Sequence, residues 1–521
     1  MSSSTVHRAG PREWGGLAVL ALPTVLLGLD VTVLYLALPS LAEDLRPSST
    51  EALWIMDAYG FLIAGSLITM GTLGDRFGRR RLLMIGVAAF GAVSVVAAFS
   101  DSTELLIASR AALGIAGATL MPSTLALISN MFADPRQRSV AIGVWATSFA
   151  LGMAMGPVVG GVMLAHFWWG SAFLLAVPVA LVALVAAPLL IPEYRAPRGG
   201  RFDLLSVVLS LIAILPVVHA VKRVAKDGPG TATIGAAVIG LVFAVLFVRR
   251  QGKLASPLLD VRLFTDRTFS AALSVLLVGL VGVGGSMLLI TQQLQLVVGL
   301  SPVEAGLWMG PPALMMLVAA IGAPLVARRV PPGIVVAVTL ALSTLGYALL
   351  TRVTAMDGVA LIVIGFGLVY LGLGAIAALG TDLVVGAAPP EKAGSASAMS
   401  ETVQELGLAL GVAVLGSLAT AVYRGRIGDG IPAGTPAEVA EAAGDGLAGA
   451  SSVADRMPDG WLDQAREAAT SGLNVAMLVA AVGSLVLALL SAVALRHIGV
   501  IGGDEPEADE AVPEGAARSE G

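Results

Sequence analysis

The chain has 521 residues, of which 56% are hydrophobic and 13% are charged, with a formal net charge of −5. This composition excludes a soluble globular protein, because average soluble domains carry about 25% charged residues. The absence of cysteine excludes disulfides, thiolate nucleophiles and cysteine-ligated metals. The acidic surplus lies mainly in the C-terminal tail and one late loop, and no basic patch indicates nucleic-acid binding.

Apolar runs long enough to cross a hydrocarbon layer of about 30 Å as helices recur along most of the chain. Transmembrane β-strands alternate apolar and polar residues, and runs such as 204–221 do not, so the spans are predicted to be helical. Breaks at glycine, proline and charged residues predict fourteen spans, near residues 15–38, 53–72, 82–99, 104–130, 139–164, 170–192, 204–222, 230–248, 269–298, 303–327, 333–351, 357–386, 396–423 and 471–495.

We therefore expect an all-α integral membrane protein with an N-terminal six-helix bundle in residues 1–192. An inserted transmembrane pair, helices 7 and 8 with their linkers, occupies 193–268, and a C-terminal six-helix bundle occupies 269–495. Residues 424–470 are a long acidic loop in that second bundle, for which we expect an extracellular position and a cap-like fold. The acidic tail, 496–521, is predicted to be disordered.

The distribution of positive charge predicts the orientation, because lysine and arginine are retained on the cytoplasmic side in short loops. A cytoplasmic N-terminus places most of the loop arginines inside, with Lys222, Arg223 and Lys226 as an exception. Both termini are then cytoplasmic. The apolar stretch after Trp14 is long and lacks a small-residue cleavage site, so we interpret it as a first span and not as a signal peptide.

The loop between the second and third spans contains a glycine- and arginine-rich motif. Glycines let helix ends approach closely, while an aspartate and arginines can form a charge lock against neighbouring helix termini. A plain cluster of cytoplasmic positive charge is the alternative, but topology alone does not require these glycines in register. The candidate conformational lock consists of Gly71, Gly74, Asp75, Arg76, Gly78, Arg79 and Arg80.

Five ionisable residues inside predicted spans are candidate functional residues, because charge is costly there and marks function. Asp30 lies midway along the first span, Asp57 early in the second, and Glu401 and Glu405 on one face of the thirteenth. Such carboxyls can hold a proton or a cationic guest, and Arg110 in the fourth span is expected to face one of them. The alternatives are that Arg110 snorkels to the outer boundary, Asp57 caps a helix, and Glu401 lies near the inner surface.

The fifth span carries a second glycine motif, formed by Gly152, Gly156, Pro157, Gly160 and Gly161. Small residues permit tight helix packing, and the proline interrupts the helical hydrogen-bond ladder. Taken alone, the motif favours a packing seam.

Aromatic and methionine side chains in the spans could hold a flat cation by stacking and cation–π attraction. The cavity candidates are Tyr35, Trp54, Tyr59, Met315 and Met316, although each alone is more typical of packing or lipid contact. No Gly-x-x-x-x-Gly-Lys-Ser loop occurs, so direct coupling to ATP is not expected.

Together these motifs resemble the drug:proton antiporter-2 family of the major facilitator superfamily, the fourteen-helix multidrug and quaternary ammonium efflux pumps. Residues 71–81 fit the superfamily loop signature, and 152–161 are similar to the exporter motif. The segment from Asp30 to Pro39 is similar to the first-span signature, with Tyr35 in place of the usual asparagine. Residues 311–316 lack the acidic residue of dication-carrying relatives, which favours monovalent cations.

The resemblance implies two six-helix bundles plus two inserted helices, and a proton-coupled antiporter that exports lipophilic, mainly monovalent cationic drugs, dyes or biocides across the bacterial inner membrane. No enzymatic activity, metal or cofactor is implied, because the proton gradient drives transport. The expected partners are lipophilic cations, protons and membrane lipids, and the expected state is a monomer. The alternatives are a dedicated self-resistance exporter of one antibiotic or natural product, an uptake symporter and a membrane-embedded sensor.

Overall fold

The computed structural model describes residues 9–132, 134–195, 203–227, 230–254, 257, 261–355, 358–388, 393–427, 435–496 and 498–499. Every regular element in these residues is a helix. Thirteen of the described helices are long and apolar enough to cross a membrane. α2 (Ser49–Phe77) is a further helix of 29 residues that packs against α4 and α15, so the described chain agrees with the expected fourteen spans of a multi-pass membrane protein.

The first six spans form one bundle in which α1 packs along α5, α2 along α4, and α3 along α4 and α7. The sixth span is broken at Leu175 into a short and a long helix, where a single helix was predicted. The elements of this bundle are α1 (Pro11–Leu45), α2, α3 (Arg79–Ala98), α4 (Thr103–Met131), α5 (Pro135–His166), α6 (Ser171–Leu174) and α7 (Ala176–Leu190).

The inserted pair, α8 (Leu204–Asp227) and α9 (Thr231–Gln251), follows, and its helices pack on each other. In the second bundle α10 packs along α15, α12 along α14, and α13 along α14 and α18. Its elements are η1 (Val261–Thr265), α10 (Arg267–Gln292), the π-helix η2 (Gln293–Val297), α11 (Pro302–Trp308), α12 (Gly310–Val326), α13 (Pro332–Leu350), α14 (Val359–Gly386), α15 (Ala393–Ile427), α16 (Ala437–Asp445), α17 (Leu447–Ser452), η5 (Ala454–Arg456) and α18 (Trp461–Ala494).

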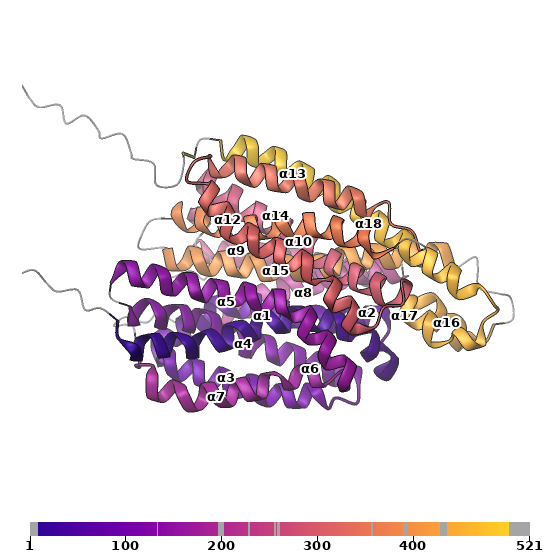
Figure 1. Cartoon of the computed structure of the whole chain (residues 1–521), viewed down its shortest axis with the longest axis horizontal. Coiled ribbons are helices and arrows are strands. Elements are labelled where there is room, and N and C mark those ends of the chain that lie inside the picture. The colour runs from indigo at the N-terminus through magenta and orange to yellow at the C-terminus, as the bar shows by residue number, and fades with distance from the viewer. Residues whose placement is uncertain are drawn as a thin grey trace, which may run out of the picture.

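The two bundles lie side by side, with α1 beginning and α18 ending at the same end of the molecule (Figure 1). We call this the terminal end, and the opposite end, which carries α16 and α17, the cap end. α8 contacts both α2 and α15, so the inserted pair lies beside the junction of the bundles. Apolar side chains such as Val185, Leu189 and Val318 are 68–69% exposed, as expected for faces that meet lipid. The residue boundaries of the predicted domains stay a prediction.

At the cap end two helices run beyond the predicted spans. α15 continues through Ile427, past the predicted end of its span near residue 423. α18 begins at Trp461, ahead of the predicted start near residue 471, and its first turns bury Trp461, Ala465 and Ala468 against the cap. The predicted disordered tail lies outside the described residues, apart from Arg496, Ile498 and Gly499.

Candidate functional site

Arg110 of α4 is buried inside the first bundle and is only 2% exposed. Its Nη1 donates a hydrogen bond to Oδ2 of Asp30 in α1 at 2.8 Å, and its Nε donates to the carbonyl oxygen of Ile55 in α2 at 3.2 Å. The guanidinium carbon also lies 4.5 Å from the ring centroid of Tyr59, a cation–π distance. A side chain so enclosed does not snorkel to a membrane surface, which disagrees with the alternative interpretation of Arg110.

Glu405 of α15 joins these residues from the second bundle. Glu405 is 6% exposed, and its carboxyl interacts electrostatically with both Asp30 and Arg110. The contact is made possible by Gly60 of α2, where an added Cβ would lie 2.9 Å from Cβ of Ala409, one turn beyond Glu405. α2 and α15 therefore approach closely at the level of this carboxyl.

Asp30, Tyr59, Arg110 and Glu405 form what we call the Arg110 cluster. It contains two carboxyl groups and one guanidinium, so full ionisation leaves a surplus of one negative charge. A buried surplus charge is costly, and burial is tolerated when the charge is neutralised. One proton or one monovalent cation provides that neutralisation.

Asp57 lies in the interior of α2 and is completely buried. The α2 N-terminus is capped instead by Ser48, whose hydroxyl accepts from the Glu51 N–H at 3.3 Å while the Glu51 carboxylate accepts from the Ser48 N–H at 2.8 Å. The alternative in which Asp57 caps a helix is therefore not supported. Tyr35, which is 5% exposed, interacts electrostatically with Asp57 and with Arg110.

Glu401 lies one turn before Glu405 on α15 and interacts with it electrostatically. It is half-buried, in contrast to Glu405. The structure thus brings Glu401 to the margin of the Arg110 cluster, on the side of α15 that leads to its first residue, Ala393.

Three of the cavity candidates pack away from the Arg110 cluster. The Trp54 ring lies 6.4 Å from that of His219 in α8. Sδ of Met315 occupies the space beside Gly367 of α14, and the Met316 backbone packs against Gly374 of the same helix. The Met315 side chain therefore packs between α12 and α14, and the glycines on α14 let the two helices touch at Met316 through their backbones.

The loop motif after α2 is held by Glu193, which follows α7. Gly78 has φ +111°, and an added Cβ would lie 2.6 Å from Oε1 of Glu193, so both backbone conformation and space require glycine. Glu193 Oε1 accepts from the Arg80 N–H at the start of α3 at 3.0 Å, and Oε2 lies 3.8 Å from Nε of Arg81. A carboxylate at this helix N-terminus also complements the helix macrodipole.

The arginines of the candidate lock bind carbonyl groups of their own bundle. Arg79 Nη1 donates to the Pro122 carbonyl at 3.3 Å, and Arg80 Nη1 donates to the Ile191 carbonyl beyond α7 at 2.9 Å. Arg76 is exposed, with its guanidinium carbon 6.0 Å from the ring centroid of the neighbouring Phe77. The arginines of the predicted lock thus bind a carbonyl inside α4, a carbonyl at the end of α7 and Glu193.

The two remaining glycines of the motif differ in how tightly they pack. An added Cβ at Gly74 would lie 2.9 Å from Cδ of Arg79, whereas one at Gly71 would make an ordinary 3.7 Å contact with Pro122. Asp75 lies in α2, but its side chain lies outside the described residues.

The glycines of α5 face two different partners. Gly152 and Gly156 pack against α1, where an added Cβ would collide with the Val25 carbonyl and the Thr32 hydroxyl respectively, and Gly160 would come within 3.1 Å of Val33. The Thr32 hydroxyl donates to the Met153 carbonyl at 3.2 Å across this seam. This face of the motif holds the first bundle together.

The other face of the motif meets the second bundle. An added Cβ at Gly161 would lie 2.6 Å from the Pro302 carbonyl oxygen and 2.9 Å from Cα of Val303 in α11. The Pro157 carbonyl occupies the corresponding space beside Gly306. The last turns of α5 and the first turns of α11 therefore touch backbone to backbone, near the cap end.

A family model of the Major Facilitator Superfamily matches residues 20–412. The chain belongs to this superfamily. It is 44% identical over 494 residues to the multidrug efflux pump LfrA of Mycolicibacterium smegmatis, covering 94% of this chain and 98% of that protein. It is 35% identical over 502 residues to the methyl viologen resistance protein SmvA of Salmonella typhimurium, covering 92% and 97%.

Solved structures agree with the superfamily fold. A bacterial homologue of the human lysosomal transporter Spinster, crystallised in an inward-facing and unoccupied conformation, matches with a TM-score of 0.64 at 17% identity, covering 94% of this chain and 98% of that one. The superfamily assignment and the described helices confirm the predicted fold class of two six-helix bundles with an inserted pair.

Glu193 and Thr32 are two contact residues that sequence reasoning did not single out. Thr32 stands inside the first-span motif but carries no charge, so a polar residue in an apolar helix was the available signal. Glu193 is an acidic residue directly after a long apolar run, in a chain region otherwise rich in arginine. Its position between two helix ends depends on α7 folding back beside α3.

Proposed function

We propose that this superfamily member exports lipophilic, mainly monovalent cations from the bacterial cytoplasm across the inner membrane, in exchange for protons. The observation that carries the proposal is the Arg110 cluster, in which a buried guanidinium is ion-paired with Asp30 and interacts electrostatically with Glu405. A proton or a cationic guest removes the surplus charge, so the two compete for the same state. The similarity to LfrA, a multidrug efflux pump, supports a broad range of substrates.

The contacts between the bundles support alternating access. α5 meets α11 through Gly161, and α2 meets α15 through Leu53, which lies 2.8 Å from the position of an added Cβ at Gly416. Both contacts lie toward the cap end. The arginines of the loop motif lie at the terminal end, which the positive-inside rule makes cytoplasmic. In this orientation the seam is closed outside, and a cation arriving from the cytoplasm displaces protons before the bundles rock.

The charge of the cluster also bears on the driving force. Exchange of one proton for one monovalent cation moves no net charge, so only the pH gradient drives it, at about 1.4 kcal/mol per pH unit. A second proton adds the membrane potential, about 2.3 kcal/mol per 100 mV. Asp57 and Glu401, which adjoin the cluster, are the carboxyls available for that second proton.

Substrate charge separates two versions of the proposal. The surplus of one charge fits a monovalent guest, as does the absence of an acidic residue in 311–316. SmvA, by contrast, is a methyl viologen resistance protein, and methyl viologen is a dication. A dication would require a third ionised carboxyl beside Asp30 and Glu405.

The experiment is transport in proteoliposomes that contain the purified protein and an imposed pH gradient. We expect accumulation of a monovalent lipophilic dye against its gradient, faster than that of methyl viologen, and collapse of accumulation when an ionophore removes the pH gradient. Accumulation that does not depend on the pH gradient would refute proton exchange. Protection of cells against one chemotype alone, in a growth panel, would indicate the dedicated exporter instead.

A further inference from the structure

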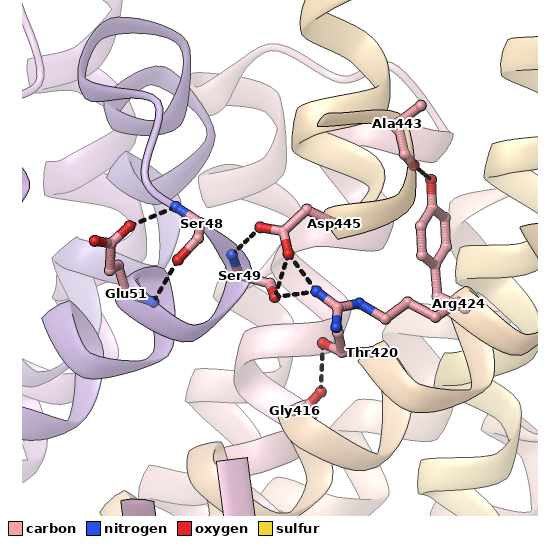
Figure 2. A network of polar contacts seen from close by, with 9 residues as sticks. Ser48, Ser49, Glu51, Gly416, Thr420, Arg424, Ala443 and Asp445 are labelled. Atoms are coloured by element: carbon pink, nitrogen blue, oxygen red, sulfur yellow. Dashed lines mark hydrogen bonds and ion pairs between the residues drawn. The ribbon is translucent and has the colours of Figure 1, made fainter. Parts of the chain in front are cut away.

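One carboxylate at the cap end joins three parts of the chain that are far apart in sequence. Asp445, the last residue of α16, accepts hydrogen bonds from the backbone N–H and the hydroxyl of Ser49, the first residue of α2. It also accepts one from the guanidinium of Arg424 in the last turn of α15, which in turn donates to the Ser49 hydroxyl at 3.3 Å (Figure 2). The Ser49 Oγ–Asp445 Oδ1 distance is 3.1 Å.

The cap that carries Asp445 is attached to the second bundle. The Tyr423 hydroxyl of α15 donates to the Ala443 carbonyl of α16 at 2.9 Å, and Val297, Tyr423 and Trp461 share an apolar cluster with Ala443. These contacts come from α15, α18 and η2, all of which belong to the second bundle. When the bundles move, the cap therefore moves with the second one, and it touches the first through the Ser49 contact and through α17, which packs against α1.

The helix geometry of α16 and α2 explains why a carboxylate occupies this position. Asp445 stands at the C-terminus of α16, where the macrodipole disfavours negative charge. It faces the N-terminus of α2, where unpaired N–H groups and the opposite end of a dipole favour it. The charge is therefore unfavourable for its own helix, and it is stabilised by Arg424 and, while the cap rests on the first bundle, by the N-terminus of α2.

We propose that Asp445, Ser49 and Arg424 form a latch that holds the outer seam closed and must open for release to the outside. The proposal rests on the alternating access of the proposed function, because rocking separates the outer ends of α2 and α15. Arg424 stays beside Asp445 during this motion, since α15 and the cap belong to one bundle. The bonds to Ser49 are the ones that break.

Ser49 and Asp445 of the latch lie in the wall of a cavity of ≈660 Å³ between the two bundles and the cap. Its wall is formed by the ends of α1, α2, α10 and α15 together with α16 and α17. Leu288 of α10 lines this cavity and is only 1% exposed. The volume is within the range of about 300–1,000 Å³ that small-molecule sites occupy, so a released compound fits there before the latch opens.

The test uses the natural absence of cysteine in the full-length chain. A single reporter, Leu288→Cys, is labelled from outside with a membrane-impermeant maleimide in intact cells or proteoliposomes. We expect Asp445→Asn and Ser49→Ala each to raise the labelling rate severalfold. Ser49→Ala leaves the attachment of the cap to α15 unchanged, so it separates latch opening from loss of the cap.

The matched control is Glu441→Gln, which alters an acidic residue of the same helix and the same cavity wall. Among the described residues Glu441 has no ion pair, and its variant is expected to label like the parent. Equal labelling of the Ser49, Asp445 and Glu441 variants would overturn the latch. Labelling requires no transported compound, so this outcome is distinct from a failure of the proposed export.

A second experiment cross-links the cap to the first bundle. The double variant Ser49→Cys with Asp445→Cys, oxidised to a disulfide, is expected to lose dye export and to regain it on reduction. Each single cysteine variant serves as the control for oxidation alone. Undiminished export by the cross-linked protein would overturn the latch, because the first bundle and the cap would then not need to separate.

Discussion

Asp30 and Arg110 are 80 residues apart in the chain and meet at 2.8 Å inside the first bundle. The Asp30 side chain is 11% exposed and the Arg110 side chain 3%. Asp30 also adjoins a small crevice between α1 and α6, beside Phe173. The pair is thus buried but not sealed, as the proposed exchange of a proton at Asp30 requires.

Asp30→Asn is expected to abolish pH-driven dye export while leaving the protein in the membrane. The amide cannot ionise, yet its oxygen still accepts from Arg110, so stability falls by only about 1–2 kcal/mol. Transport in proteoliposomes and thermal unfolding of the purified variant measure both effects. The control is Asp44→Asn, which changes a carboxylate on the same helix that accepts from Trp169 at 2.8 Å. Full export by Asp30→Asn would remove this carboxyl from the coupling mechanism.

Glu405→Gln is expected to weaken the binding of a monovalent cationic dye and to flatten its pH dependence. With one carboxyl and one guanidinium left, the cluster is already neutral, so protons no longer compete with the guest at that position. In the parent protein, affinity falls as the pH falls, because protonation removes the attractive charge. Dye binding in detergent between about pH 5 and 9 measures the slope. Glu401→Gln is the comparison on the same helix face, with a smaller expected change, and an unaltered slope for Glu405→Gln would contradict the charge argument.

Gly161→Ala is expected to reduce export about tenfold or more. The added methyl would lie 2.6 Å from a backbone oxygen of Pro302, so α11 must move away from α5. The clash costs about 1–3 kcal/mol, and only in the conformation where these helices touch. The population of that conformation therefore falls by the corresponding factor. Gly143→Ala is the control on the same helix, since nothing lies within 4 Å of its added Cβ. Equal export by the two variants would show that the α5–α11 contact does not limit the cycle.

The helical fold and its fourteen spans were predictable because the bilayer imposes a length and a composition on each span. The partnership of Arg110 with a carboxylate was predictable for a similar reason, since few residues inside spans can neutralise a guanidinium. Which carboxylate it meets, and the joint arrangement with Glu405, depend on how α1, α2, α4 and α15 pack. That packing is a long-range property that span composition does not encode.

Met315 and Met316 are two residues whose role could not be predicted from the sequence. Their residue type suits a cation site and an interhelical seam equally well, and for Met315 the glycine at 367 of α14 decides for the seam. The latch was not predictable either, because Ser49 and Asp445 are separated by 396 residues and the acidic loop has several carboxylates with nothing in the sequence to distinguish Asp445. Glycine spacing, in contrast, predicted tight packing of α5, and the structure adds that Gly161 faces a different bundle from Gly152.

Glu193→Gln is expected to lower the free energy of unfolding by about 1 kcal/mol. The carboxylate places a negative charge at the N-terminus of α3 and lies between Arg80 and Arg81. Because its side chain is 22% exposed, solvent screens these interactions. Thermal unfolding of the purified protein measures the loss. Glu104→Gln, an exposed carboxylate in the first turn of α4, is the control and should change stability by less than about 0.5 kcal/mol. Identical melting of the two variants would mean that Glu193 does not stabilise the loop motif.

Asp203→Asn tests the connection between the two inserted helices. Asp203 precedes α8 and accepts from Arg250 of α9 at 2.9 Å and from the Ser206 hydroxyl at 2.5 Å, and the Gln251 amide donates to the same hydroxyl at 2.8 Å. Burial opposes ionisation, but the hydrogen bonds from Arg250 and Ser206 outweigh it and lower the pKa of the Asp203 carboxyl below 3.8. The pair therefore stabilises the folded protein fully above the ordinary carboxyl pKa and loses this contribution as the pH falls through the lowered value.

Because Arg250 is one-third exposed, the loss in Asp203→Asn is expected to be about 1 kcal/mol at neutral pH. The difference in melting temperature from the parent should stay constant between about pH 8 and pH 5 and shrink as the solution is acidified below about pH 4. Asp101→Asn, at an exposed aspartate before α4, is the control and should melt like the parent throughout. A difference that grows on acidification would mean that the carboxyl is held protonated, and the sign of the pKa shift would then be wrong.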